Sequence, residues 1–195
     1  MIAIKTRSLL TTLLLLLVTT CSIAADKYII DTKGAHAFIQ FRVKHLGYSW
    51  LYGRFDRFEG EFSMDGDDFE TTKISVTVDT TSLNSNHAER DKHLRGKKFL
   101  HVDKYPESKF VSTAIKRTGA NTLLVKGDLT LRGVTKAVEF PAEYIGGGND
   151  PWGGYRKGFS GKLVFPMKDF GIPRDLGPAS RDVELILDIE GIKQK

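Results

Sequence analysis

Apolar and polar side chains alternate with a period of two along most of this chain, and this pattern restricts the folds open to it. Val76 and Val78, for example, alternate with Ser75 and Thr77. Successive side chains of a strand point to opposite faces of a sheet, so the alternation indicates antiparallel strands with one buried face. The segments that predict strands lie near 27–31, 36–44, 54–65, 73–80, 108–118, 122–132, 134–145, 157–168 and 182–192.

Turn residues separate these segments and leave little room for helices. Asp65-Gly66 and Arg132-Gly133 have hairpin composition, and the glycine-rich stretch 146–154 predicts a longer loop. One helix fits near 87–96, and a helical turn fits at 45–51. The fold class is therefore all-β, as a sandwich or an antiparallel β-barrel of about eight strands with one short charged helix. Closure into a barrel is favoured because it leaves no unpaired sheet edge.

The first 24 residues have the composition of a secretory signal peptide. Lys5 and Arg7 precede an apolar run, and Ser22-Ile23-Ala24 offers a small-x-small cleavage site. We expect cleavage after Ala24, which leaves one mature domain of residues 25–195. Without Lys5 and Arg7, 27 of the 29 basic residues remain against 24 acidic residues, a net charge of +3. That balance, with no clustered basic face, gives no reason to expect nucleic acid as a partner.

Cys21 is the only cysteine of the chain, and it lies within the expected signal. The mature domain is therefore expected to fold without disulfides, although secreted proteins can form them. An alternative is that Val18-Thr19-Thr20-Cys21 serves as a lipoprotein processing site. In that case Cys21 would carry a lipid anchor.

Residues 86–95 are the stretch that is richest in titratable groups. Asn86 followed by Glu89 predicts an N-cap and a capping box, and Glu89–His93 has the spacing of an i,i+4 ion pair, as does Asp91–Arg95. These patterns predict a short, solvated, self-paired helix at one barrel end.

Chemistry at this helix is the weaker interpretation. His87 and His93 are six residues apart, so they do not share a helix face as a metal-binding pair would, and we expect no metal site. Ser85 lies near His87, but it has no nucleophile elbow around it. The basic neighbours of Glu89 keep it ionised and make it a poor general acid. We therefore assign no catalytic residue.

A second site-like stretch runs over residues 45–53, where aromatic side chains are bounded by glycine. Large apolar groups in such a loop either pack as a lid or line the mouth of a barrel. We expect His45, Trp50 and Tyr52 at the rim, together with His87 and Arg90 from the charged helix, where they would meet the head group of a ligand.

The inward strand faces predict a wall of large apolar side chains. Phe38 and Phe41 have opposite parity, and Phe41 is favoured for the inside because Ile39 and Val43 share its face. Inward glycines, of which Gly127 is one, would either leave room for a ligand or mark bends. The side chains expected to face a cavity are Phe41, Phe58, Phe62, Val76, Leu129 and Phe140.

Several segments together resemble the YceI family. They are Phe38-Ile39-Gln40-Phe41, the stretch 45–53, the charged stretch 86–95, the stretch 127–136 and Asp175-Leu176-Gly177-Pro178-Ala179-Ser180. The resemblance covers essentially the whole mature chain. Gly96-Lys97-Lys98 departs from the family by adding charge just after the helix.

The resemblance implies a lipocalin-like barrel in the periplasm that holds a polyisoprenoid or similar long-chain amphiphile, with links to alkaline pH and stress. The expected partner is this isoprenoid or fatty ligand, and no cofactor is expected besides it. A transient inner-membrane partner and a homodimer are left open.

Two other function classes stay open. One is an enzyme or redox accessory that acts on an isoprenoid or quinone-like head group through His87, Glu89, Arg90 and Asp91. The other is an interaction protein that presents its aromatic loop to a membrane redox partner.

Overall fold

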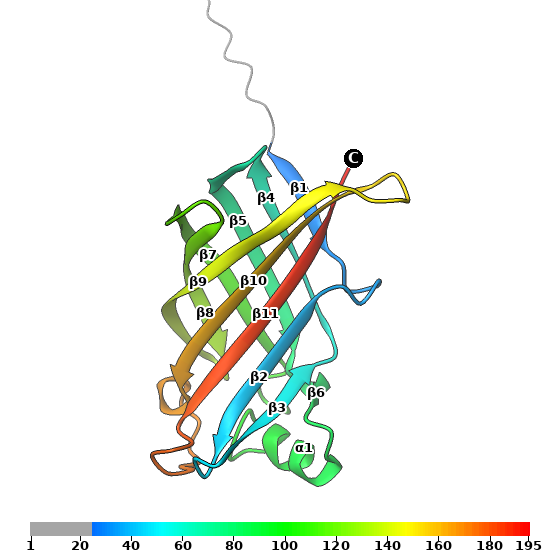
Figure 1. Ribbon diagram of the computed structural model, residues 1–195. Coiled ribbons are helices and arrows are strands. Elements are labelled where there is room, and N and C mark those ends of the chain that lie inside the picture. Colours follow the sequence, from blue (N-terminus) through cyan, green and yellow to red (C-terminus); the bar gives the residue numbers. More distant parts are fainter. Residues whose placement is uncertain (1–24) are drawn as a thin grey trace, which may run out of the picture.

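The computed structural model describes residues 25–195, so the expected signal peptide and Cys21 lie outside the described residues. The described chain forms an antiparallel β-barrel with its charged helix at one end (Figure 1). The helices are α1 (Ala88–Arg95) and the short 3₁₀ turns η1 (Thr80–Ser82) and η2 (Met167–Phe170). The strands are β1 (Asp26–Ile30), β2 (Phe38–His45), β3 (Ser49–Phe55), β4 (Phe58–Asp65), β5 (Asp68–Asp79), β6 (Leu83–Asn84), β7 (Glu107–Arg117), β8 (Thr122–Leu131), β9 (Val134–Asn149), β10 (Tyr155–Pro166) and β11 (Asp182–Lys193).

Eight strands close the barrel, in the ring order β1-β4-β5-β7-β8-β9-β10-β11 and back to β1. β11 makes the closure because its two halves pair with different strands. Its last residues pair with β1, with Gly191 opposite Ile30, and its first half pairs with β2, with Leu185 opposite Phe41. This confirms the expected all-β barrel of about eight strands.

The expected strand 54–65 is divided in the structure. Asp56 and Arg57 leave the sheet, and their backbone amides donate to the Ser82 carbonyl and to Ser82 Oγ, respectively. β3 therefore pairs with β2 along its length, but it pairs with β6 only through Arg54 and Phe55. Residues 49–53 keep a free edge, so the expectation that closure removes every sheet edge is wrong here.

Two further expectations, a helical turn at 45–51 and a loop at 146–154, differ from the structure. The helical turn at 45–51 is wrong, because Leu46 and Gly47 both have positive φ and form the tight turn between β2 and β3. The glycine-rich stretch 146–154 is divided: residues 146–149 belong to β9, where Gly146, Gly147 and Gly148 pair with β10, and only residues 150–154 form the expected loop. Backbone hydrogen bonds alone extend that ladder, and they do not require side chains.

Candidate functional site: the barrel cavity

The barrel encloses a cavity of about 1430 Å³ that opens at the end where α1 lies. That volume is above the roughly 300–1,000 Å³ of pockets for drug-sized ligands. Its wall is mostly apolar and comes from the inward faces of the long strands. Leu163 and Phe165 of β10 and Leu185 and Leu187 of β11 are examples. The cavity can therefore take a long apolar chain.

The structure places five of the six side chains predicted for the cavity on its wall, namely Phe41, Phe62, Val76, Leu129 and Phe140. The parity argument also holds, because Phe41 is buried whereas Phe38 is 40% exposed. Phe58 is the exception. It is half-buried at the start of β4, directly after the break at 56–57, and it does not line the cavity.

Aromatic rings lie against glycines of the wall, which explains how large side chains leave the cavity open. A Cβ on Gly53 would lie 2.2 Å from the Phe41 ring, and one on Gly191 would lie 2.3 Å from the Phe62 ring. Gly127 gives the same space to Phe110, with a distance of 2.5 Å. The glycines therefore let rings fold flat along the barrel wall.

A layer of aromatic side chains forms the floor of the cavity. Tyr28 stacks on Phe62 with their centroids 4.7 Å apart, and Phe159 meets Phe62 edge to face at 5.5 Å. Tyr144 and Phe69 complete the layer, with 5.0 Å between their centroids. Burial, followed by the charge of Asp26, raises the pKa of Tyr28 to about 12. Contacts between aromatic rings therefore close this end of the barrel.

Lys157 covers the floor from within the barrel. It is 2% exposed, and its Nζ donates to the Gly66 carbonyl at 2.6 Å and to Asp67 Oδ1 at 2.8 Å. These bonds hold the turn between β4 and β5 across the closed end.

Arg156 fastens the seam of the barrel on the outer surface of the same end. Its guanidinium contacts Asp31 at 2.7 Å, Asp150 at 2.8 Å and Glu190 at 2.5 Å, so it joins the β1–β2 connection, the β9–β10 turn and β11. Burial favours the neutral form of Asp31. Hydrogen bonds from His36, Arg156 and the Gly34 amide outweigh that effect and lower its pKa to about 2.

This cluster also contains the one group of potential metal ligands among residues 25–195. Oxygen and nitrogen atoms of Asp31, His36 and Glu190 lie within 4.8 Å of one another. Arg156 Nη1 already bonds to both carboxylates, so a guanidinium stands where a cation would bind. The cluster works as a structural ion pair.

The open end is built around α1, and its cap differs from the prediction. Asn86 has a φ of 60°, which is unsuitable for an N-cap. The N-cap is His87 instead, whose Nδ1 accepts the Arg90 backbone amide at 3.2 Å. His87 is exposed and does not line the cavity, so its expected place at the rim is wrong.

The predicted ion pairs within α1 do not form. Asp91 is buried and accepts the amide of Ser85 at 2.8 Å as well as its hydroxyl, and Arg95 donates to the Leu83 carbonyl at 2.6 Å. Glu89 and His93 are exposed and make no ion pair in the described part of the chain. Contacts with β6 and with Ser85, the residue that follows it, replace self-pairing because α1 packs against this segment.

Arg90 is the predicted rim residue that the structure places most securely. Its Nε donates to Ser85 Oγ at 2.7 Å, its Nη2 donates to the Ser85 carbonyl, and its side chain lines the cavity mouth. The four side chains of the enzyme hypothesis do not converge, because His87 caps the helix, Asp91 is buried on Ser85 and Glu89 is exposed.

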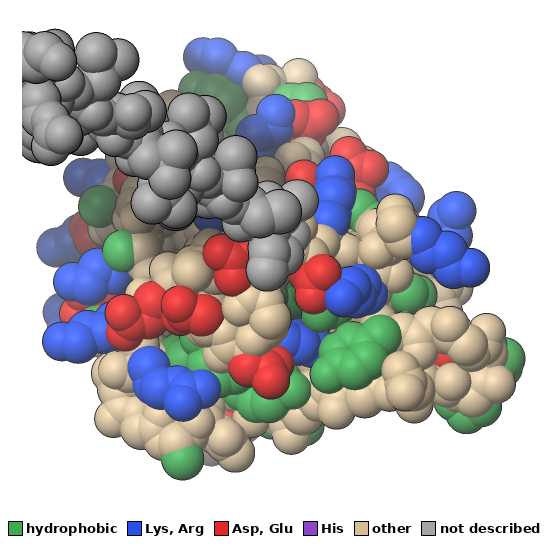
Figure 2. Space-filling view, turned by 90° about the horizontal axis from the view of Figure 1, so that it is seen from above, with side chains coloured by type: hydrophobic (Ala, Val, Ile, Leu, Met, Phe, Trp, Pro, Cys, Tyr) green, Lys and Arg blue, Asp and Glu red, His purple; other side chains and the backbone are tan. Residues whose placement is uncertain are grey.

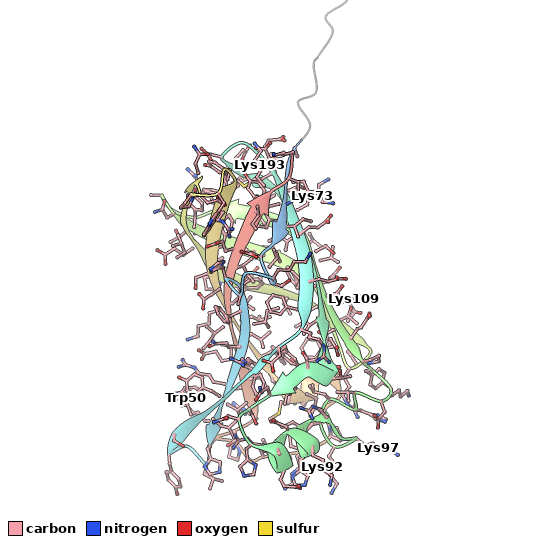
Figure 3. The ribbon with its side chains drawn as sticks, turned by 90° about the vertical axis from the view of Figure 1, so that its right-hand side faces the viewer. Trp50, Lys73, Lys92, Lys97, Lys109 and Lys193 are labelled. Carbon is pink, nitrogen blue, oxygen red and sulfur yellow. The ribbon has the colours of Figure 1, made fainter. Side chains whose placement is uncertain are left out.

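The aromatic hairpin borders the cavity from its outer side. Trp50 and Tyr52 lie on the outer face of β3, where Arg42 stacks 4.1 Å from the Trp50 ring centre and donates to Tyr52 Oη. Both residues still border the cavity, as does His45, because β3 has a free edge beside the opening. In Figure 3, Trp50 points away from α1. These side chains therefore flank the mouth and do not cover it.

A sequence model of the YceI-like domain matches residues 28–191. The chain belongs to the YceI-like family. Its relatives in this family include a UPF0312 protein of Ectopseudomonas mendocina, 56% identical over 89% of this chain and 90% of the relative. A UPF0312 protein of Shewanella denitrificans is also 56% identical, over 92% of this chain and 93% of the relative.

Solved structures share the fold of this YceI-like chain. The YCEI protein of Campylobacter jejuni has a TM-score of 0.71 with 26% identity, over 78% of this chain and 91% of its own. Burkholderia cenocepacia BcnA has a TM-score of 0.72 with 20% identity, over 83% and 98%. A polyisoprenoid binding domain from Saccharophagus degradans has a TM-score of 0.61 with 14% identity, over 86% and 98%.

Lys92 and Arg174 are cations at the mouth that sequence reasoning missed, whereas Lys97 and Lys98 were noted as added charge just after the helix but were not assigned to the site. Lys92, Lys97, Lys98 and Arg174 line the opening of this YceI-like barrel. The run from Lys92 to Lys98 contains four basic residues and no acid, and this composition was the available signal. The sequence could not predict that this run lies beside a cavity, since its position depends on how α1 packs.

Proposed function

We propose that this YceI-like protein binds a long-chain lipid of the polyisoprenoid type inside its barrel and serves as a periplasmic carrier or buffer for it. The enclosed apolar cavity of about 1430 Å³ is the observation that carries the proposal. The Saccharophagus degradans domain, described as polyisoprenoid binding, has the same fold and supports it. The proposed role is binding and not catalysis.

The dimensions suit a chain that lies along the barrel axis. β10 has 12 residues, which corresponds to roughly 40 Å of extended strand. Each buried methylene contributes about 0.8 kcal/mol, so fifteen to twenty buried carbons outweigh the usual cost of association. A longer tail would fold back or extend through the mouth. Such a ligand is expected to remain bound during purification.

The place of action is part of the same proposal. The leader-like residues 1–24 support export, and none of the helices in residues 25–195 has the length and hydropathy to cross a bilayer. A lipid carrier needs to meet a membrane, and we propose a transient partner at the inner membrane. A homodimer stays a prediction that light scattering on the purified protein tests directly.

The experiment is extraction of the purified protein with organic solvent, followed by mass spectrometry of the extract. We expect a long-chain lipid in an amount close to one per barrel. The Leu129→Trp variant fills the cavity from its wall and should reduce that amount. Val111→Trp is the matched control, because Val111 is 51% exposed on a neighbouring strand. Protein that yields no lipid and binds none when offered one would contradict the proposal.

A further inference from the structure

The mouth of the cavity is cationic on one side. Arg90 and Lys92 line it from α1, and Lys97 and Lys98 line it from the turn after the helix. In Figure 3, Lys92 lies on α1 and Lys97 lies on the segment after it, both at the open end. Of the described residues that line the cavity, none is an aspartate or glutamate. The charged side chains at the mouth of this apolar cavity are therefore all positive.

These cations are not engaged in pairs with acids. The ion pairs within residues 25–195 include none of Arg90, Lys92, Lys97 and Lys98. The buried acid nearest in sequence, Asp91, accepts from Ser85. The charges at the rim are therefore available to a ligand.

Arg90 is held in a fixed position before any ligand arrives. Two of its nitrogens donate to Ser85, and Ser85 is anchored in turn by Asp91. Nη1 donates to no acceptor within residues 25–195, so donor capacity remains. A guanidinium fixed in this way loses little conformational freedom when it binds an oxyanion.

We propose that this mouth selects lipids with an anionic head group, a carboxylate or a phosphate, over neutral lipids with the same tail. The inference rests on the proposed function, because the tail has to occupy the barrel for its head to reach Arg90. A charged head cannot enter the apolar interior without a large desolvation cost, so it stays at the rim. There it gains charge-assisted hydrogen bonds that a neutral head does not make.

The test compares ligands that differ only in head group. Delipidated protein is loaded with a fluorescent apolar probe, which is displaced by hexadecanoic acid or by hexadecan-1-ol at pH 8 without vesicles. We expect the acid to bind about tenfold more tightly, as for one charge-assisted contact. The advantage should shrink at high salt, because exposed charges are screened. Dodecyl phosphate against dodecan-1-ol repeats the comparison for a phosphate head.

Variants assign the effect to the rim. The double variant Lys97→Gln/Lys98→Gln should weaken binding of the acid about threefold or more and leave the alcohol unchanged. Both lysines are exposed and lie outside strands, so the fold should tolerate the change. Lys73→Gln/Lys116→Gln removes the same charge from exposed positions of β5 and β7, and it should leave both ligands unaffected.

Each result has a distinct meaning. Equal affinity for acid and alcohol would overturn head-group selection and leave lipid binding intact. Failure of both ligands to bind would contradict the proposed function itself. A charge effect that appears only when phosphatidylglycerol vesicles are present would show that the lysines contact a bilayer surface, and head-group selection would again be wrong.

Discussion

The two ends of this barrel use similar residues in opposite ways. At the closed end, Arg156 contacts three acids and Lys157 is buried on a turn. At the open end, Arg90 and Lys97 line an apolar cavity without acidic partners among the described residues. Seen from the closed end, acidic and basic side chains are interspersed over the surface (Figure 2).

The same contrast holds for aromatic side chains. Tyr28 is 1% exposed in the stacked floor, whereas Tyr48 is 89% exposed at the tip of the β2–β3 hairpin. Side chains that are buried and paired within the protein stabilise the fold, whereas exposed aromatic side chains and unpaired charges are available to bind a ligand or partner. The closed end therefore supplies much of the stability, and the open end is left free for a ligand.

Arg156→Met should produce the largest loss of stability. It leaves Asp31, Asp150 and Glu190 without their shared cation. Because the cluster is only partly buried, we expect a cost of about 2–3 kcal/mol, between that of an exposed and that of a buried ion pair. Chemical denaturation followed by circular dichroism measures the change. Lys97→Met removes the same charge from the open end and should leave stability nearly unchanged. Equal losses in the two variants would abolish the contrast between the ends.

Acid should weaken the closed end by about 2 kcal/mol through Asp31 alone. Its pKa in the folded protein is about 2, below its ordinary value of 3.8. The folded state thus binds fewer protons than the unfolded chain between these values, so the contribution is complete above about pH 4 and disappears toward pH 2. Unfolding free energies measured across this range test the sign.

Asp31→Asn is the control for this pH dependence. The variant should be less stable at neutral pH, and its stability should fall less steeply with acid. Part of the slope should persist because hydrogen bonds and charge from Arg156 also lower the pKa of Asp150. If the unfolding free energy of the variant depended on pH as steeply as that of the unmodified protein, Asp31 would not contribute to the pH dependence.

Ser85→Ala should have a smaller effect, about 1–2 kcal/mol, because it deprives the buried Asp91 carboxylate of its hydroxyl donor. Arg90 also loses one of its two anchors. Thermal unfolding measures the cost, with the exposed Ser49→Ala as a matched control. A loss greater than that of Arg156→Met would reverse the order of the two ends.

Tyr48→Ser should change the free energy of unfolding by less than about 0.5 kcal/mol, as for other exposed positions. The side chain is 89% exposed, so little surface is buried by it. Tyr28→Ser is the contrasting variant at the closed end, and it should be clearly destabilised because it empties a stacked position. A strong effect of Tyr48→Ser would mean that the hairpin tip packs on something.

The alternation of apolar and polar residues predicted most of the barrel strands, because a side-chain period of two directly reflects strand geometry. The wall position of Phe41 followed from the parity of its neighbours. The break at Asp56-Arg57 was not readable, since it depends on hydrogen bonds to Ser82, which is distant in sequence. The cap at His87 was missed because asparagine favours both an N-cap and a positive φ, so the residue type alone does not decide between them.

The candidate site was only partly predictable. Arg90 was expected at the rim and lies there, but the ion-pair spacing of Asp91 and Arg95 suggested self-pairing that does not occur. Helical spacing indicates which side chains can meet. It does not show that Ser85 and the Leu83 carbonyl of β6 offer better partners.

The amino-acid sequence by itself determined that this chain forms an antiparallel barrel with apolar inward faces, because each strand's pattern is local. Only the tertiary structure decided which end is closed. Closure depends on Arg156 meeting acids from three segments and on aromatic rings meeting across strands. The same packing left the cations after α1 beside an apolar cavity, so the two ends differ through contacts between distant segments and not through composition.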